Sequence, residues 1–124
     1  MPANQPLISI QTAPHYTWGG PDSDQCDGWH LLRTAELSII EERMPSATAE
    51  RRHLHHRARQ FFYVLAGELT LEIDGTANIL TTGQGLEIAP GTPHQALNHS
   101  AADTRFLVTS QPPSHGDRVD APLA

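Results

Sequence analysis

The sequence lacks lysine altogether, and all eight of its basic residues are arginine. Acidic residues outnumber them, because 14 Asp and Glu give a formal net charge of −6 at pH 7. Binding to the phosphates of nucleic acid needs a positively charged face, so this balance argues against a nucleic-acid partner. We find no physical reason for the absence of lysine itself.

Cysteine and long apolar runs are also scarce. Cys26 is the only cysteine, which excludes a disulfide within the chain and is compatible with a reducing compartment. The longest unbroken apolar run covers residues 61–66, whereas a membrane-spanning helix needs about 20 apolar residues. The N-terminal residues show neither the basic region nor the apolar stretch of a signal peptide. We therefore expect a cytoplasmic protein that has no membrane partner.

The length and composition suit one globular domain: 124 residues, of which 38% are hydrophobic and 18% charged. We expect this domain to cover residues 1–124. Its parts would be an irregular lead-in over residues 1–28, a core over about residues 29–110, and a surface tail over residues 111–124. The lead-in is rich in proline and glycine, which disfavour a helix there.

From residue 29 onward, the pattern is that of short strands separated by turns. We expect strands over residues 29–34, 37–44, 61–65, 69–73, 77–80, 86–88, 94–98 and 105–110. Asp74-Gly75 is a hairpin-turn pair of the kind that needs positive φ. Residues 47–59 contain helix-favouring Ala, Glu and Arg, but the β-prone run that follows them favours strand, loop and strand. This spacing of strands predicts an all-β sandwich or closed barrel.

Histidines are concentrated in residues 51–67, ahead of that β-prone run. His53 and His55 are two residues apart, so on a strand both would project from the same face. Two imidazoles on one face are the beginning of a metal site, which needs further donors from elsewhere in the chain.

Two spaced motifs resemble those of the cupin superfamily. The first is His-x-His-x4-Gln-x6-Gly, ending at Gly67, and the second is Gly-x5-Ala-Pro-Gly-x2-His-x3-Asn, ending at Asn98. The resemblance covers roughly residues 37–110 and implies a double-stranded β-helix, the jelly-roll barrel. Residues 110–118 also look like the tail of small single-domain bacterial cupins, whose function is mostly unassigned.

The resemblance implies one divalent transition metal per chain, with His53, His55 and His94 as ligands. Gln60 stands where the family carries glutamate, and it would offer either a neutral oxygen to the metal or a hydrogen bond to a substrate or metal-bound water. Such a donor set leaves the cation its full charge and favours an anionic ligand. Donors alone do not choose among Zn, Fe, Ni, Cu and Mn.

Strand parity predicts the surroundings of this site. Phe62 and Val64 share the parity of Gln60, so we expect them to line the cavity. The alternate residues of that strand, Phe61, Tyr63 and Leu65, would face outward against the lead-in or a second subunit. The resemblance to cupins implies a homodimer.

The remaining polar residues receive ordinary roles. We expect His56 to be exposed and four other histidines to lie on the surface or in loops: His15, His30, His99 and His115. Asn98 would stabilise a turn. The parity of residues 37–44 leaves open whether Glu41 or Glu42 faces inward, and the inward one could serve as a general base.

Three functions are compatible with this sequence. The first is a mononuclear metalloenzyme that acts on a small anionic or chelating molecule by oxygenase or isomerase chemistry. The second is a non-catalytic module that binds a small molecule, and the third is a metal-free barrel of the sugar-epimerase kind, in which His and Tyr transfer protons. An inward carboxylate near the metal would favour catalysis, whereas an apolar wall would favour binding or redox chemistry with oxygen.

Overall fold

The computed structural model describes residues 7–20 and 25–123, and all of their regular structure is β-strand. The strands are β1 (His15–Trp18), β2 (Cys26–Arg33), β3 (Ser38–Met44), β4 (Thr48–Ala49), β5 (His53–His55), β6 (Arg59–Ala66), β7 (Glu68–Ile73), β8 (Thr76–Thr81), β9 (Gly85–Ile88), β10 (His94–Asn98), β11 (Thr104–Gln111) and β12 (Arg118–Asp120). Across these described residues, no helix has the length and apolarity that a membrane span requires.

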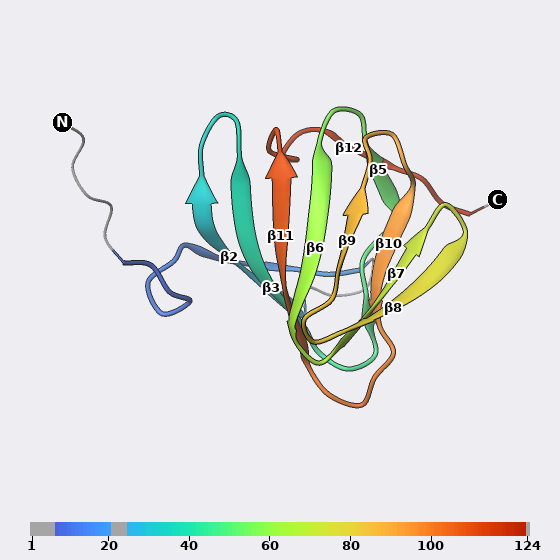
Figure 1. The fold of residues 1–124 in the computed structure, drawn as a ribbon, viewed down its shortest axis with the longest axis horizontal. Coiled ribbons are helices and arrows are strands. Elements are labelled where there is room, and N and C mark those ends of the chain that lie inside the picture. The colour runs from blue at the N-terminus through green and yellow to red at the C-terminus, as the bar shows by residue number, and fades with distance from the viewer. Residues whose placement is uncertain (1–6, 21–24, 124) are drawn as a thin grey trace.

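The strands form two antiparallel sheets. Sheet A has the order β1-β2-β3-β11-β6-β9, and sheet B has the order β12-β5-β10-β7-β8, with β4 also paired to β10. Figure 1 shows the strands of sheet A from β2 to β9 side by side, next to the layer that holds β10, β7 and β8. This arrangement confirms the predicted all-β jelly roll.

Buried and exposed side chains alternate along the strands, and the buried ones form a core between the two sheets. On β6, Phe62 and Val64 are buried, whereas Phe61, Tyr63 and Leu65 are exposed. The same inward positions on other strands supply the rest of the core, including Met44, Leu69, Leu71, Ala96 and Phe106. The hairpin between β7 and β8 turns at Asp74 and Gly75, whose φ angles of 49° and 92° confirm the predicted turn.

The N-terminal lead-in is more regular than predicted. Within residues 1–28, β1 pairs with β2 and so adds an edge strand to sheet A; residues 1–6 and 21–24 lie outside the described residues. The pairing depends on Gly28, because a Cβ there would lie 2.1 Å from Cζ of Tyr16. Glycine therefore lets the Tyr16 ring cross the backbone of β2.

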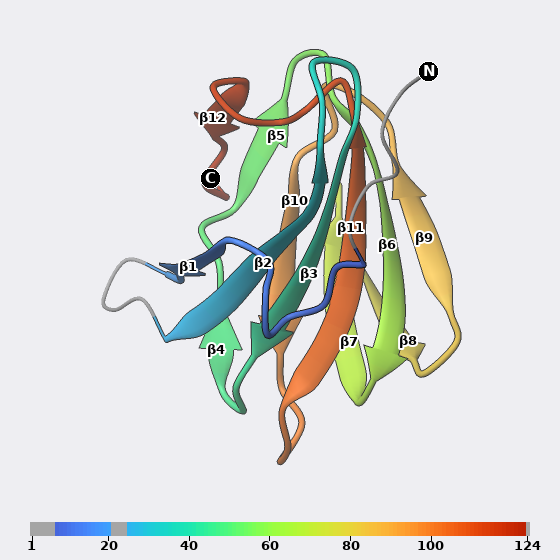
Figure 2. The ribbon, with the colours of Figure 1, turned by 90° about the vertical axis from the view of Figure 1, so that its left-hand side faces the viewer.

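The C-terminal segment is also more than a surface tail. Its strand β12 pairs with β5 over three residues, and Figure 2 shows the two strands next to each other. The buried carboxylate of Asp117 accepts hydrogen bonds from the backbone N–H groups of His56 (3.2 Å), Arg57 (2.9 Å) and Ala58 (2.9 Å). These bonds hold the turn that follows β5. An acidic residue in a polar tail shows no periodicity, so no local pattern predicts this contact.

Asn98 stabilises a turn, as predicted. Its buried amide donates to the carbonyl groups of Met44 (2.9 Å) and Ala102 (2.8 Å), and its Oδ1 accepts from the backbone N–H of Ser100 (2.9 Å). The side chain thus joins the end of β3 to the loop that follows β10.

We expect Asn98→Ala to lower the free energy of unfolding by about 2–3 kcal/mol, because it leaves buried backbone groups without partners. The neighbouring His99 is exposed, and His99→Ala should change the same quantity by less than about 0.5 kcal/mol. Urea denaturation followed by tryptophan fluorescence measures both changes. Equal transition midpoints for the two variants would contradict the assigned role.

Candidate metal centre

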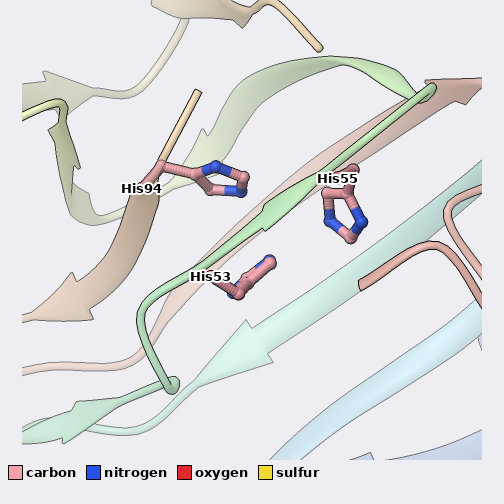
Figure 3. Close-up of side chains that lie close together, drawn as sticks. All are labelled: His53, His55 and His94. Carbon is pink, nitrogen blue, oxygen red and sulfur yellow. The ribbon is translucent and has the colours of Figure 1, made fainter. Parts of the chain in front are cut away.

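Three buried histidines from two neighbouring strands come together inside the barrel. His53 and His55 lie on β5, and His94 lies on β10 directly opposite His53 in the strand register. One ring nitrogen from each lies within 4.8 Å of the others. Figure 3 shows the three rings facing a common space, His53 and His55 from one strand and His94 from the other.

Backbone hydrogen bonds orient two of the rings. Nδ1 of His53 donates to the carbonyl group of Arg51 (2.7 Å), and Nδ1 of His94 donates to that of Thr92 (2.9 Å). Because a carbonyl oxygen only accepts, each Nδ1 carries the hydrogen and each Nε2 keeps its lone pair. Nε2 of His94 and Nδ1 of His55 are buried and have no hydrogen-bond partner in the described part of the chain.

Burial also keeps the imidazoles neutral. It lowers the pKa of His53 to about 3 and that of His55 to about 4, and it lowers the pKa of His94 as well. Neutral imidazole is the form that binds a metal ion, so protons do not compete for these nitrogens near pH 7.

Gln60 contributes a further unpaired oxygen. It is buried on β6, where its Nε2 donates to Oγ of Ser110 (3.1 Å). Its Oε1 is buried and has no partner among the residues that the structure describes. Gln60 lines the same cavity as His53 and His55. Converging nitrogen lone pairs with a nearby free amide oxygen fit a divalent transition metal ion.

The site opens into a cavity of about 450 Å³ between the two sheets. Paired residues on the inward face of sheet A form successive rungs; all members of the first two rungs line the cavity, and of the third rung only Glu42 does. The first rung is Arg33, Ser38, Ser110 and Gln60, the second is His30, Ile40, Val108 and Phe62, and the third is Gly28, Glu42, Phe106 and Val64. The wall is therefore polar at the first rung and mainly apolar at the second.

Phe62 is among the residues that line this cavity, and Val64 is not. Val64 lies one rung further along, paired with Phe106, and neither side chain has any exposed surface. The Phe62 and Phe106 rings are 5.7 Å apart and stacked. Parity predicts the inward face of a strand correctly, but it does not say where along the strand the cavity ends.

An inward carboxyl group lies on the third rung. Glu42 lines the cavity, and Oε2 of Glu42 accepts a hydrogen bond from the hydroxyl of Tyr16 (2.9 Å). Burial raises the pKa of Glu42 to about 7. Burial and the neighbouring carboxyl group of Glu42 both raise the pKa of Tyr16. Glu41 faces the other way and pairs with Arg105. The structure thus decides which of the two glutamates points inward.

A second carboxyl group, Glu50, was not anticipated from the sequence. Its Oε2 accepts a hydrogen bond from the backbone N–H of Ala96 (2.8 Å), and its Oε1 lies 3.9 Å from Nδ1 of His53. Burial raises its pKa to about 8. Neither Glu50, in a polar loop, nor Tyr16, in the lead-in, has a sequence pattern that could have indicated the cavity.

The other histidines divide into two groups. His56 and His99 are exposed, as predicted, and His15 pairs with Asp27 near the surface. His30 corrects the prediction: it lies on β2, lines the cavity and has a buried Nδ1. His115 is exposed but also lines the cavity.

The sequence comparisons identify one family. The family model described as "Cupin domain" matches residues 40–110, which is more than half of the chain and includes Gln60 and His94 as well as His53 and His55. The chain matches no curated protein.

Solved structures show the same fold at low sequence identity. The polyketide cyclase RemF from Streptomyces resistomycificus superposes with a TM-score of 0.82 at 16% identity, over 98% of this chain and 88% of that one. A sugar phosphate isomerase of the cupin superfamily from Silicibacter pomeroyi gives 0.73 at 20% identity, over 86% and 75% of the two chains. A predicted oxalate decarboxylase from Thermotoga maritima gives 0.76 at 16% identity, over 86% and 99%. At these identities the similarity shows the fold alone.

Proposed function

This chain belongs to the cupin family, and on that premise we propose that it is a metal-dependent enzyme that moves a proton on a small oxygen-bearing molecule, in an isomerase-type reaction. One observation carries the proposal: His53 and His55 of the histidine group line the same cavity as the hydrogen-bonded pair Tyr16–Glu42. An inward carboxyl group is what distinguishes a proton-transfer site from an apolar binding barrel.

We propose His53, His55 and His94 as the metal ligands, with the Oε1 of Gln60 as a further donor. The unpaired buried atoms and the neutral rings support this assignment. A bound divalent cation would polarise a carbonyl or hydroxyl oxygen of the substrate as a Lewis acid. Because no anionic side chain belongs to the proposed ligand set, the cation would favour a substrate with negatively charged or chelating oxygens.

Glu42 is the proposed acid–base group. A carboxyl group whose pKa lies near 7 is populated in both protonation states at neutral pH, which suits it to accept a proton and return it. Tyr16 keeps its hydrogen, because its pKa is raised, and its hydroxyl orients Oε2 of Glu42. Phe62 and Val108 supply apolar surface that limits water around this pair.

We favour isomerase-type over oxygenase-type chemistry because the cavity wall holds the ionisable pair Tyr16–Glu42. Oxygen chemistry at a metal does not need an ionisable pair in the wall, whereas proton transfer does. Among similar structures, one is named a sugar phosphate isomerase and another a polyketide cyclase, names compatible with non-oxidative chemistry on oxygen-rich molecules.

A second candidate is metal-free acid–base catalysis of the sugar-epimerase kind. It is favoured by the contact between Tyr16 and His30, whose ring centroids are 5.0 Å apart and which line the same cavity. A non-catalytic binding module is the remaining alternative. The two experiments below separate these three functions.

Untagged protein should contain nearly one transition metal ion per chain, and the double variant His53→Ala/His94→Ala should contain almost none, because each substitution removes a proposed ligand. Elemental mass spectrometry measures the content. The matched control is His56→Ala/His99→Ala, which removes two exposed histidines and should retain the metal. Wild-type protein without metal, even after reloading, would refute the ligand assignment.

The metal-loaded protein should catalyse exchange of carbon-bound hydrogen with D2O in a 1,3-diketone or an α-hydroxyketone phosphate, as followed by NMR. Glu42→Gln should slow the exchange by about 100-fold or more, since it removes the base but keeps an acceptor for Tyr16. Glu36→Gln, which changes an exposed glutamate, should exchange like the wild type. Exchange that survives metal removal would favour the metal-free reaction, and no exchange with any probe would favour a binding module.

We also propose that the protein is a cytoplasmic homodimer. Phe61, Tyr63 and Leu65 form an apolar row on the outer face of β6, and they remain 45%, 39% and 38% exposed within one chain. The described part of the lead-in therefore leaves this row available to a second copy. The buried free thiol of Cys26 is compatible with the cytoplasm.

Light scattering on the untagged protein should give a mass of about two chains. Phe61→Ser/Leu65→Ser should shift the mass toward one chain, because it removes apolar contact area. The control Ile79→Ser changes an exposed residue of β8 on the other sheet and should leave the mass unchanged. A wild-type mass of one chain would contradict the dimer.

A further inference from the structure

The arginines of this chain fall into two groups. Five of the eight lie within 4.0 Å of a carboxylate: Arg43, Arg52, Arg57, Arg59 and Arg105. For Arg33, Arg51 and Arg118, no carboxylate oxygen of the described residues lies within that distance. With no acidic partner among the described residues, the N–H donors of these three guanidinium groups are available to water or to a ligand.

Two of these three arginines line the cavity. Arg33 is the last residue of β2 and pairs with Ser38 on the first rung of sheet A. It points inward because the register of β2 shifts between His30 and Leu32. Arg118 begins β12 in sheet B and pairs with His55, which brings it next to the histidine group. Arg51 does not line the cavity.

The donors of both guanidinium groups are largely free. Arg118 donates one weak hydrogen bond, from Nη2 to the carbonyl oxygen of Arg51 at 3.3 Å. Arg33 donates none to any side chain or backbone group in the described residues. Both residues line the cavity and are exposed, so they stand at its rim, on opposite sheets of the barrel.

The two carboxyl groups that line the cavity, Glu42 and Glu50, form no ion pair with Arg33 or Arg118. Oε2 of Glu42 is bonded to Tyr16, and Oε2 of Glu50 to the backbone N–H of Ala96. The remaining titratable side chains that line the cavity are histidines: His30, His53, His55 and His115. Arginine presents paired N–H donors that match carboxylate and phosphate oxygens.

We propose that Arg33 and Arg118 form an oxyanion subsite at the cavity rim that binds a carboxylate or phosphate group of the substrate. That the anion belongs to a substrate rests on the proposed function. Such a substrate is anionic at one end and carries its reacting oxygens at the other. The anionic end stays at the rim while the reacting oxygens reach the histidine group.

Binding of inorganic phosphate and of acetate to the untagged protein tests the subsite, with titrations by calorimetry and NMR at constant ionic strength. Four variants are compared with the wild type: Arg33→Gln, Arg118→Gln, the double variant Arg33→Gln/Arg118→Gln, and the control Arg51→Gln. Thermal unfolding checks that each variant is folded. His53→Ala/His94→Ala is titrated as well, since an anion could bind to a metal ion instead.

We expect one phosphate or acetate per chain, bound at least about tenfold more weakly by the double variant and less than about twofold more weakly by Arg51→Gln. Each single variant should fall between the double variant and the wild type. Binding should persist in His53→Ala/His94→Ala. The wild type could also lack metal and hydrogen exchange while the anion still binds to it and to His53→Ala/His94→Ala. That result would refute the proposed function but not the subsite.

Three results would overturn the subsite itself. The first is that neither anion binds to the wild type. The second is that the double variant binds like the wild type, and the third is that Arg51→Gln weakens binding as much as the double variant does, which would indicate a general effect of net charge.

Discussion

The candidate metal centre depends on one backbone pairing, that of His53 on β5 with His94 on β10. Directly opposed residues of an antiparallel pair share one face of the sheet, so this register places two imidazoles side by side. His55 joins them because it is two residues along the same strand. A shift of one residue in either strand would turn a histidine to the outer face. The register of a very short strand therefore controls the whole site.

That short strand is held from both sides. β5 has three residues and pairs with β10 at a single position, whereas it pairs with β12 at three positions. The carboxylate of Asp117 holds the turn after β5 through three backbone N–H groups. The C-terminal segment thus supports the strand that carries two of the three histidines, and through Arg118 it also contributes to the cavity wall.

The polar groups of the cavity are arranged by depth. Guanidinium groups stand at the rim, while neutral imidazoles and carboxyl groups with raised pKa values lie within. Burial explains both shifts, since a low dielectric disfavours the charged form of either group. A divalent cation among the histidines would reverse this preference for a nearby carboxyl group and favour its ionised form. Metal binding and the charge of Glu50, whose Oε1 lies 3.9 Å from Nδ1 of His53, would then be linked through electrostatics.

By itself, the sequence predicted the fold class, most of the strands and the grouping of His53, His55 and His94. It could do so because the alternation of apolar and polar residues, the turn residues and the motif spacing are local properties of the chain. His53 and His55 share a face in any strand, and Asp74-Gly75 forms its turn wherever the hairpin lies. Tertiary structure alone decided that Glu42 rather than Glu41 faces inward, that Val64 lies beyond the end of the cavity, and that β1 and β12 belong to the sheets. Tyr16, Glu50 and Arg118 reach the cavity from segments with no periodic pattern. Their positions depend on contacts between residues far apart in the chain, and such contacts cannot be predicted from the local order of amino acids.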